Sequence, residues 1–295
     1  MKKYLLTTIL ILLFWPFHLS AQQSHGTIKE SLIMESKILG EEVSFSIYLP
    51  PDYEESSRSY PVLYLLHGYS DDETGWTQFG EVKNIMDQEV DKTSVTPMII
   101  VMPDAGVSWY INSHDGSVRY EDFMVQEFIP HIEELYRARA EKQYRAIAGL
   151  SMGGYGSMVL AVKNPDLFAA AAPLSAAIST RNNIVTMSME PWNNYYGDRY
   201  GQDLEGEDRL TQHFKKNSVL DIIKNSEPDS LKKVRYYIDC GDDDFLIRGN
   251  MKLHEVMLDR EIPHEFRVRD GAHTWTYWRT ALPEVLKFVS QSFHR

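Results

Sequence analysis

The 295-residue sequence predicts an α/β protein in which helices cover both faces of a mostly parallel central sheet. Short apolar runs with the composition of strands alternate with segments whose apolar residues recur at helical spacing. Two of the runs, Tyr60–Leu66 and Met98–Met102, are continuously apolar, as expected of central strands covered on both sides. The composition, 43% hydrophobic and 24% charged, is ordinary for a folded protein.

Eight segments are predicted to form the strands. The first two, Ile28–Ser36 and Val43–Leu49, alternate apolar and polar residues and are separated by Gly40-Glu41, which predicts an antiparallel pair. The other predicted strands are Tyr60–Leu66, Met98–Met102, Tyr144–Ala148, Phe168–Leu174, Val234–Cys240 and Glu265–Arg269.

Helices are expected between these strands. The predicted helices are Glu81–Glu89, Glu121–Arg137, Tyr155–Lys163, about Arg248–Asp259 and Trp275–Phe293. Pro130 lies inside the second of them and is expected to bend it.

The segment 180–217 interrupts this rhythm because it is polar and aromatic and has no clear period. An insertion at the carboxyl end of a strand lies over the active site in a sheet of this kind, so we expect a cap that influences specificity. The alternative is a surface excursion without a role in binding. No repeat or long linker is present, so residues 22–295 are expected to form a single domain.

The first 21 residues have the pattern of a secretory signal peptide. Lys2 and Lys3 precede the apolar stretch Leu5–Phe17, and Leu19-Ser20-Ala21 offers a small-residue cleavage site. The alternative is a retained N-terminal anchor. The pattern predicts export to the periplasm or the extracellular space.

The formal net charge of −12 bears on possible partners. So acidic a surface disfavours nucleic acid and anionic membranes as partners.

Ser151 is the strongest candidate for a nucleophile. It lies in Gly149-Leu150-Ser151-Met152-Gly153, which fits the G-x-S-x-G pattern of a serine on a sharp turn between a strand and a helix. A predicted strand precedes it and a predicted helix follows. A chance match is the alternative, since such a short pattern recurs in unrelated proteins.

A serine nucleophile needs a histidine base and a carboxylate that orients the base. His273 follows the last predicted strand in a glycine-bearing turn, which makes it the best candidate for the base. The acid is expected in Cys240-Gly241-Asp242-Asp243-Asp244, where loop position favours Asp244. The clustered carboxylates could instead bind calcium. Cys240, the only cysteine, is expected to be buried and inert.

The oxyanion that forms during acyl transfer needs two N–H donors. Met152, directly after the serine, would provide one of them. Tyr69, after the predicted strand that ends at Leu66, would provide the other, and Gly68 would allow a close approach of the backbone. His67 is expected to be a structural member of the same loop.

Taken together, LLHGY at Tyr69, GLSMGG at Ser151, CGDDDF at Asp244 and GAHTWTYWR at His273 resemble the esterase D-type "putative esterase" family. That family includes feruloyl, acetyl xylan and tributyrin esterases, S-formylglutathione hydrolases and mycolyltransferases of the antigen 85 type. The resemblance covers roughly Ile28 to Phe293. It implies an α/β-hydrolase fold, acyl-enzyme chemistry, no metal or organic cofactor, and Asp244 as the acid.

Loop aromatics indicate the class of substrate. Flat rings suit sugars and phenolic acyl groups, and those expected to contact substrate are Trp76, Trp109, Tyr110 and Trp192. Tyr195 and Tyr196 also fall in segments that could border the pocket. The preferred hypothesis is an exported esterase that removes feruloyl or acetyl groups from plant polysaccharide or oligosaccharides. The alternatives are a short-chain carboxylesterase of broad specificity and a non-catalytic relative that binds carbohydrate or protein.

Overall fold

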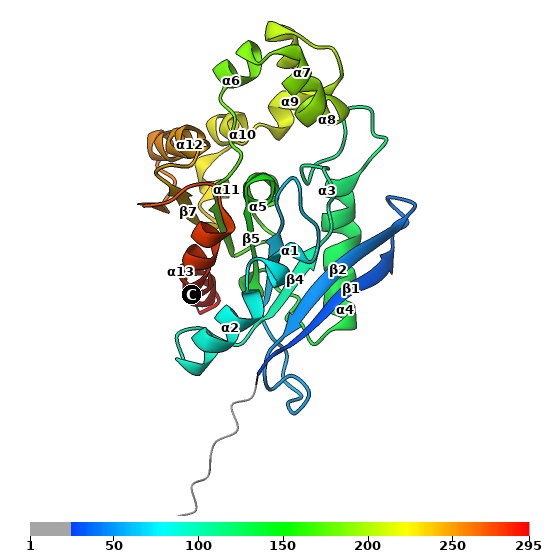
Figure 1. Cartoon of the computed structure of the whole chain (residues 1–295), viewed down its shortest axis with the longest axis vertical. Coiled ribbons are helices and arrows are strands. Elements are labelled where there is room, and N and C mark those ends of the chain that lie inside the picture. The colour runs from blue at the N-terminus through cyan, green and yellow to red at the C-terminus, as the bar shows by residue number, and fades with distance from the viewer. Residues whose placement is uncertain (1–24, 295) are drawn as a thin grey trace, which may run out of the picture.

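An eight-stranded sheet forms the centre of the computed structural model, which describes residues 25–294 (Figure 1). The strands, in spatial order β1-β2-β4-β3-β5-β6-β7-β8, are β1 (Thr27–Glu35), β2 (Glu42–Leu49), β4 (Ile99–Pro103), β3 (Val62–Leu66), β5 (Arg145–Leu150), β6 (Ala170–Leu174), β7 (Arg235–Gly241) and β8 (His264–Arg269). The signal peptide predicted at 1–21 lies outside the described residues.

The pairing of the strands confirms the predicted architecture. β1 and β2 are antiparallel to each other, and β2 is antiparallel to β4, whereas the pairs from β4 to β8 are parallel. Each strand begins and ends within two residues of the predicted range. With helices on both faces, this is an α/β fold of the α/β-hydrolase type.

Two layers of helices bury the two faces of the sheet. Leu63, Leu65 and Ile100 point into one core, which α2 (Val82–Asp91) and α13 (Trp275–Ser292) cover side by side. Val62, Tyr64 and Leu66 point into the opposite core. The helices that cover this second face include α4 (Ile129–Leu135), α5 (Met152–Lys163), α10 (Val219–Asn225) and α12 (Ile247–Asp259). Among residues 25–294, none of the helices combines the length and the apolar character that a membrane span requires.

The helix predicted at 121–137 forms, but in three parts. α3 (Tyr120–Phe123) continues into a π-helical turn at Met124–Phe128 and then into α4. Pro130 lies in the first turn of α4, where its missing N–H costs least. The π-helical turn directs Glu127 toward the β1–β2 turn, where its carboxylate accepts hydrogen bonds from the Ser36 hydroxyl (2.6 Å) and the Lys37 N–H (2.8 Å).

The segment 180–217 forms short helices beyond one end of the sheet, at the top of Figure 1. They are α6 (Arg181–Thr186), α7 (Met189–Trp192), a π-helical turn (Asn193–Gly197), α8 (Asp198–Tyr200) and α9 (Gln212–Asn217). The buried guanidinium of Arg209 joins them, because it donates to the carbonyls of Leu204, Ile184 and Met187. It also lies 4.7 Å above the ring of Trp192. No helical period was visible in this sequence because each helix is too short to show one.

Candidate active site

Ser151 sits on the sharp turn between β5 and α5. Its backbone angles, φ 55° and ψ −114°, lie where a residue with a side chain is strained. The turn is fixed by hydrogen bonds from the Ser151 N–H to the Leu174 carbonyl (2.9 Å) and from the Ala177 N–H to the Ser151 carbonyl (3.0 Å). The serine side chain is thus held at the carboxyl end of the central strands.

The glycines around Ser151 are required by close packing between backbones. A Cβ on Gly149 would lie 2.5 Å from the carbonyl oxygen of Gly153. A Cβ on Gly153 would lie 2.5 Å from the carbonyl oxygen of Leu66. Neither backbone can move away without disturbing the sheet, so the G-x-S-x-G pattern has a steric origin here.

The structure brings Ser151, His273 and Asp244 together from three distant parts of the chain. The Nε2 atom of His273 lies 3.0 Å from the Oγ of Ser151, and its Nδ1 atom lies 2.8 Å from the Oδ2 of Asp244. An ionised carboxylate can only accept, so Nδ1 carries the proton and Nε2 is left to accept the proton of the serine hydroxyl. This is the arrangement that activates a serine for nucleophilic attack.

The imidazole of His273 is held between two aromatic rings. The ring centroid of Phe245 lies 4.6 Å from the centroid of the imidazole. The ring centroid of Trp278 lies 4.9 Å from it, and the two rings meet edge-on. Phe245 directly follows the acid in the chain, but it is not buried behind it, because the residue is 75% exposed. Phe245 instead lies beside the imidazole, at the rim of the site.

Asp244 is a buried carboxylate that remains ionised. Burial acts to raise its pKa, but hydrogen bonds from His273, the Leu246 N–H and Ser175 outweigh that effect and hold the pKa of Asp244 below its ordinary value. The Leu246 N–H lies 2.8 Å from Oδ1, so both carboxylate oxygens have partners. The charge that would stabilise an imidazolium is therefore in place at neutral pH.

The neighbouring aspartates have different surroundings. Asp242 and Asp243 are exposed and gather with Asp270, with their carboxylates within 4.8 Å of one another, while Asp244 is turned toward His273. The calcium alternative would have used Asp244 as a ligand together with its two neighbours, and Asp244 is directed elsewhere. Cys240 is buried, and burial raises the pKa of its thiol to about 12, as an inert thiol requires.

Tyr69 and Met152, whose backbone N–H groups are expected to bind the oxyanion, line the same pocket as Ser151. Met152 is the first residue of α5, so helix geometry leaves its N–H without an intrahelical acceptor. The N–H of Tyr69 has no acceptor in the part of the chain that the structure describes. His67 accepts from the Ala105 N–H at Nε2 (2.8 Å) and donates from Nδ1 to the Gly68 carbonyl (2.8 Å), which confirms its structural role.

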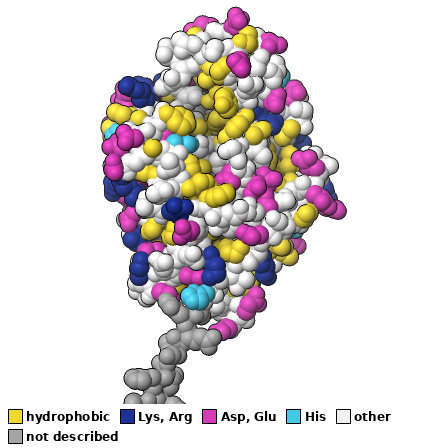
Figure 2. All heavy atoms as spheres, in the orientation of Figure 1, with side chains coloured by type: hydrophobic (Ala, Val, Ile, Leu, Met, Phe, Trp, Pro, Cys, Tyr) yellow, Lys and Arg dark blue, Asp and Glu magenta, His cyan; other side chains and the backbone are white. Residues whose placement is uncertain are grey.

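A pocket of about 340 Å³ opens over Ser151 between the sheet and the segment 180–217. Its rings are those of Tyr69, Trp109, Tyr195, Tyr196 and Phe245. None of the described residues that line it carries a charge. Figure 2 shows hydrophobic side chains gathered below the part of the molecule at the top of the view, with charged groups mostly around them. The pocket is suited to an uncharged, flat group.

Three of the four aromatic residues predicted to contact substrate are buried away from this pocket. Trp76 donates its indole N–H to the Leu66 carbonyl (3.0 Å) and packs against Trp275. Tyr110 donates to the His67 carbonyl, and Trp192 donates to the Gly201 carbonyl. All three are core residues. The prediction of substrate contact was therefore wrong for them.

Trp109 is the predicted aromatic residue that does line the pocket. Its indole N–H donates to the Tyr195 carbonyl (2.8 Å), and its ring stacks on Tyr196 at 4.9 Å. Trp109 thus joins the body of the protein to the segment 180–217.

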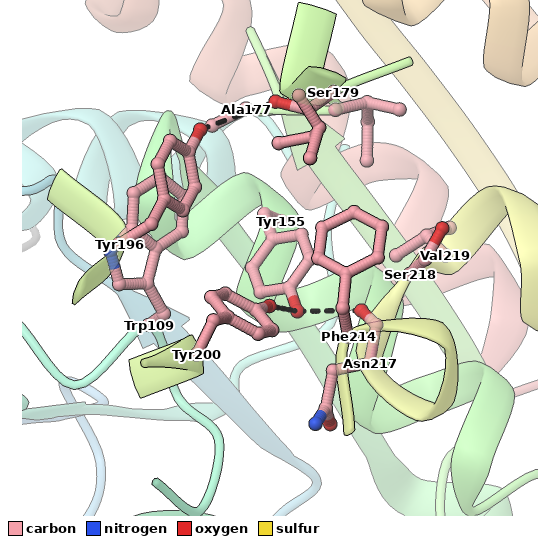
Figure 3. Close-up of a pocket in the computed structure, with 12 residues that line it drawn as sticks. Trp109, Tyr155, Ala177, Ser179, Tyr196, Tyr200, Phe214, Asn217, Ser218 and Val219 are labelled. Atoms are coloured by element: carbon pink, nitrogen blue, oxygen red, sulfur yellow. Dashed lines mark hydrogen bonds between the residues drawn. The ribbon is translucent and has the colours of Figure 1, made fainter. Parts of the chain in front are cut away.

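Several lining residues were not predicted: Ala177, Met187, Pro191 and Leu246. They carry no chemical signal of their own, and only their position in the loops after β6 and β7 could have indicated them. Behind Trp109 and Tyr196 lies a smaller chamber, where the Tyr155 hydroxyl donates to the Asn217 carbonyl and contacts the Tyr200 hydroxyl (Figure 3).

The comparisons with known proteins agree on one family. The family model described as "Putative esterase" matches residues 36–289. An esterase of Mycobacterium tuberculosis is 29% identical over 259 residues, which are 82% of this chain and 54% of that protein. The chain therefore spans about half the length of this relative.

Two further relatives match over nearly their whole length. An acetyl esterase of Caldicellulosiruptor saccharolyticus is 24% identical over 264 residues, 87% of this chain and 96% of that protein. A solved structure described as a ferulic acid esterase is 33% identical, has a TM-score of 0.78, and is aligned over 91% of this chain and 99% of that one.

Proposed function

Because this chain belongs to the "Putative esterase" family and is a serine carboxylic-ester hydrolase, we propose that it removes feruloyl or acetyl groups from acylated plant saccharides. The observation that carries the proposal is the hydrogen-bonded chain from Ser151 through His273 to Asp244 beneath an uncharged aromatic pocket. A non-catalytic binding protein would not need these three groups in contact.

In the proposed first half-reaction, the Oγ of Ser151 attacks the ester carbonyl while Nε2 of His273 takes the hydroxyl proton. The N–H groups of Met152 and Tyr69 donate to the oxyanion of the tetrahedral intermediate. His273 then gives its proton to the departing alcohol oxygen, and the acyl group stays on Ser151.

In the second half-reaction, water replaces the alcohol. His273 takes a proton from the water as it attacks the acyl-enzyme, and returns it to Oγ of Ser151 when the carboxylic acid leaves. Asp244 stays ionised throughout and stabilises the imidazolium. No step requires a metal or an organic cofactor.

The pocket supports an aromatic or small acyl group. The rings of Tyr69, Trp109, Tyr195 and Tyr196 line it, and flat aromatic rings suit a phenolic acyl group. One relative is described as a ferulic acid esterase and another as an acetyl esterase. Met187 and Pro191, which belong to the segment 180–217, line the pocket, so we propose that this segment acts as the specificity cap.

The test is a panel of three substrates. We expect kcat/KM for methyl ferulate or for acetylated xylan to exceed that for tributyrin by at least about tenfold, because the aromatic pocket discriminates among acyl groups. Equal values for all three would overturn the saccharide proposal and indicate a short-chain carboxylesterase of broad specificity.

We also propose that the protein is exported, on the pattern of Lys2, Lys3 and the apolar stretch that follows. N-terminal sequencing of the protein from its native host should begin at Gln22. A protein that retains residues 1–21 would contradict cleavage.

A further inference from the structure

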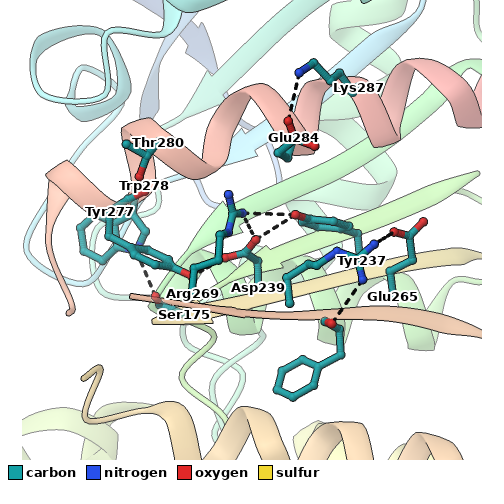
Figure 4. A network of polar contacts seen from close by, with 12 residues as sticks. Ser175, Tyr237, Asp239, Glu265, Arg269, Tyr277, Trp278, Thr280, Glu284 and Lys287 are labelled. Carbon is teal, nitrogen blue, oxygen red and sulfur yellow. Dashed lines mark hydrogen bonds and ion pairs between the residues drawn. The ribbon is translucent and has the colours of Figure 1, made fainter. Parts of the chain in front are cut away.

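A buried carboxylate outside the Ser151–His273–Asp244 triad has an unusual set of partners. Asp239, in β7, is 0% exposed. Its Oδ1 accepts from the Tyr277 hydroxyl (2.5 Å), and its Oδ2 accepts from the Arg269 guanidinium and from the Tyr237 hydroxyl (2.8 Å), as Figure 4 shows. No step of the proposed mechanism uses Asp239.

Two of these partners stand at the two ends of the loop that carries His273. Arg269 is the last residue of β8, and Tyr277 lies in the first turn of α13. The seven residues between them include His273. The carboxylate of Asp239 therefore binds both the end of the strand before the loop and the start of the helix after it.

The loop packs closely on Tyr277 and on the turn that carries the acid. A Cβ on Gly271 would lie 2.5 Å from Cδ2 of Tyr277, so the phenol ring rests directly against the loop. The Asp243 N–H donates to the Gly271 carbonyl (3.0 Å), and the Asp242 N–H donates to the Arg269 carbonyl (2.9 Å). A shift of Tyr277 or Arg269 would move both His273 and the Asp244 turn.

Stability alone does not account for these contacts. Burying a carboxylate carries a desolvation cost, and a buried ion pair is often replaced by apolar residues without loss of stability. Burial and the hydrogen bond to Asp239 raise the pKa of Tyr277, so its hydroxyl remains a donor over the working pH range. The contacts instead fix the positions of β7, the end of β8 and the start of α13 relative to one another.

We propose that Asp239, Arg269 and Tyr277 are positioning residues that hold His273 within hydrogen-bond reach of Ser151 and Asp244. This inference rests on the proposed hydrolytic function of the same site. The 3.0 Å contact between Nε2 of His273 and Oγ of Ser151 depends on the loop position, and a misplacement of about 1 Å can cost about 100-fold in rate.

Two tyrosines provide a matched test. Tyr277→Phe and Tyr237→Phe each remove one hydroxyl that donates to Asp239, and each keeps the ring. The Tyr237 hydroxyl also accepts from the Arg269 guanidinium (3.2 Å), but Arg269 keeps its ion pair with Asp239 in Tyr237→Phe. Only Tyr277 belongs to the helix that follows His273, whereas Tyr237 lies in β7 with Asp239. Loss of stability alone should affect both variants alike.

For p-nitrophenyl acetate, Tyr277→Phe should lower kcat by about 10- to 100-fold with little change in KM. Tyr237→Phe should stay within about threefold of the wild-type kcat. Thermal unfolding should show both variants folded. Equal kcat values for the two variants, or a wild-type kcat for Tyr277→Phe, would overturn the proposal.

Asp239→Asn, alone and combined with Tyr277→Phe, provides the second measurement. If both act through the same contact, the double variant should lose much less than the product of the two single losses. A fully multiplicative loss would contradict a shared role.

The rate at which a fluorophosphonate modifies Ser151 separates this inference from the proposed function. If the wild-type protein hydrolysed no ester, the proposed function would fail. The modification rates of Tyr277→Phe and Tyr237→Phe would still show whether His273 depends on Tyr277.

Discussion

At the scale of single residues, the surroundings of a side chain decide its role. Three consecutive aspartates follow β7, and they have the same chemistry in isolation. Asp244 is buried against His273, while Asp242 and Asp243 face solvent beside Asp270. Loop position alone favoured Asp244 in the sequence, and the structure supplies the contact that distinguishes it.

Substitution of each aspartate tests this distinction. Asp244→Asn should lower kcat by at least about 1,000-fold, because an amide cannot stabilise the imidazolium or hold the correct tautomer. Asp243→Asn should stay within about threefold of the wild type. Asp242→Asn should do so as well, because the amide oxygen can still accept from the Gly271 N–H. Similar losses for all three, measured with p-nitrophenyl acetate, would contradict the assignment of the acid.

The pH dependence of stability gives a second test of Asp244. Its pKa is lowered in the folded protein, so ionised Asp244 stabilises the fold above its ordinary pKa of about 3.9. That contribution is lost as the pH falls from there through the lowered pKa. Below about pH 4, the unfolding free energy of the wild type should therefore fall relative to that of Asp244→Asn. Urea unfolding of both proteins over a range of pH measures this difference. A difference that is constant down to pH 2.5 would contradict the lowered pKa.

The aromatic residues show that the role of a single large ring was not predictable from its local sequence. The sequence places Trp76, Trp109, Tyr110 and Trp192 in segments expected to be loops, yet Trp109 alone of these four lines the pocket. Whether a large ring packs in the core or faces a ligand depends on neighbours that are far away in sequence. The serine, the histidine and their spacing to strand ends were predictable because the local turn geometry requires specific residues there.

At the scale of elements, the strands were predictable and the short helices within the segment 180–217 were not. Continuous apolar runs such as those at β3 and β4 reflect burial on both faces, and this signal is local. Residues 180–217 are instead held by contacts between residues that are far apart within the segment, among them those of the Arg209 guanidinium with the carbonyls of Ile184 and Met187. Such contacts leave no periodic pattern in the sequence.

Replacing Arg209 tests the role of this segment. Arg209→Met removes the donors to the carbonyls of Ile184 and Met187, and Met187 lines the pocket. KM for methyl ferulate should rise at least about fivefold, while kcat for p-nitrophenyl acetate should change little. Arg181→Met, which removes only an exposed ion pair with Glu207, is the control and should behave as the wild type. Unchanged KM in Arg209→Met would contradict a role of the segment in binding.

At the scale of the whole molecule, the sheet assembles the site. Ser151 follows β5, Asp244 follows β7 and His273 follows β8, and these parallel strands end at the same edge. Sequence order predicted this gathering, since strands that alternate with helices carry their functional loops at the carboxyl ends. The spatial order of the strands, with β4 between β2 and β3, was not evident from the sequence.

Ser151→Ala tests whether Ser151 is the nucleophile of an ester hydrolase. Hydrolysis of p-nitrophenyl acetate is measured for the wild type and for the variant, with circular dichroism and thermal unfolding to establish that both are folded. We expect the folded variant to lose at least about 10,000-fold in kcat, because alanine has no hydroxyl that can form the acyl-enzyme. A folded Ser151→Ala variant with wild-type activity would contradict the account.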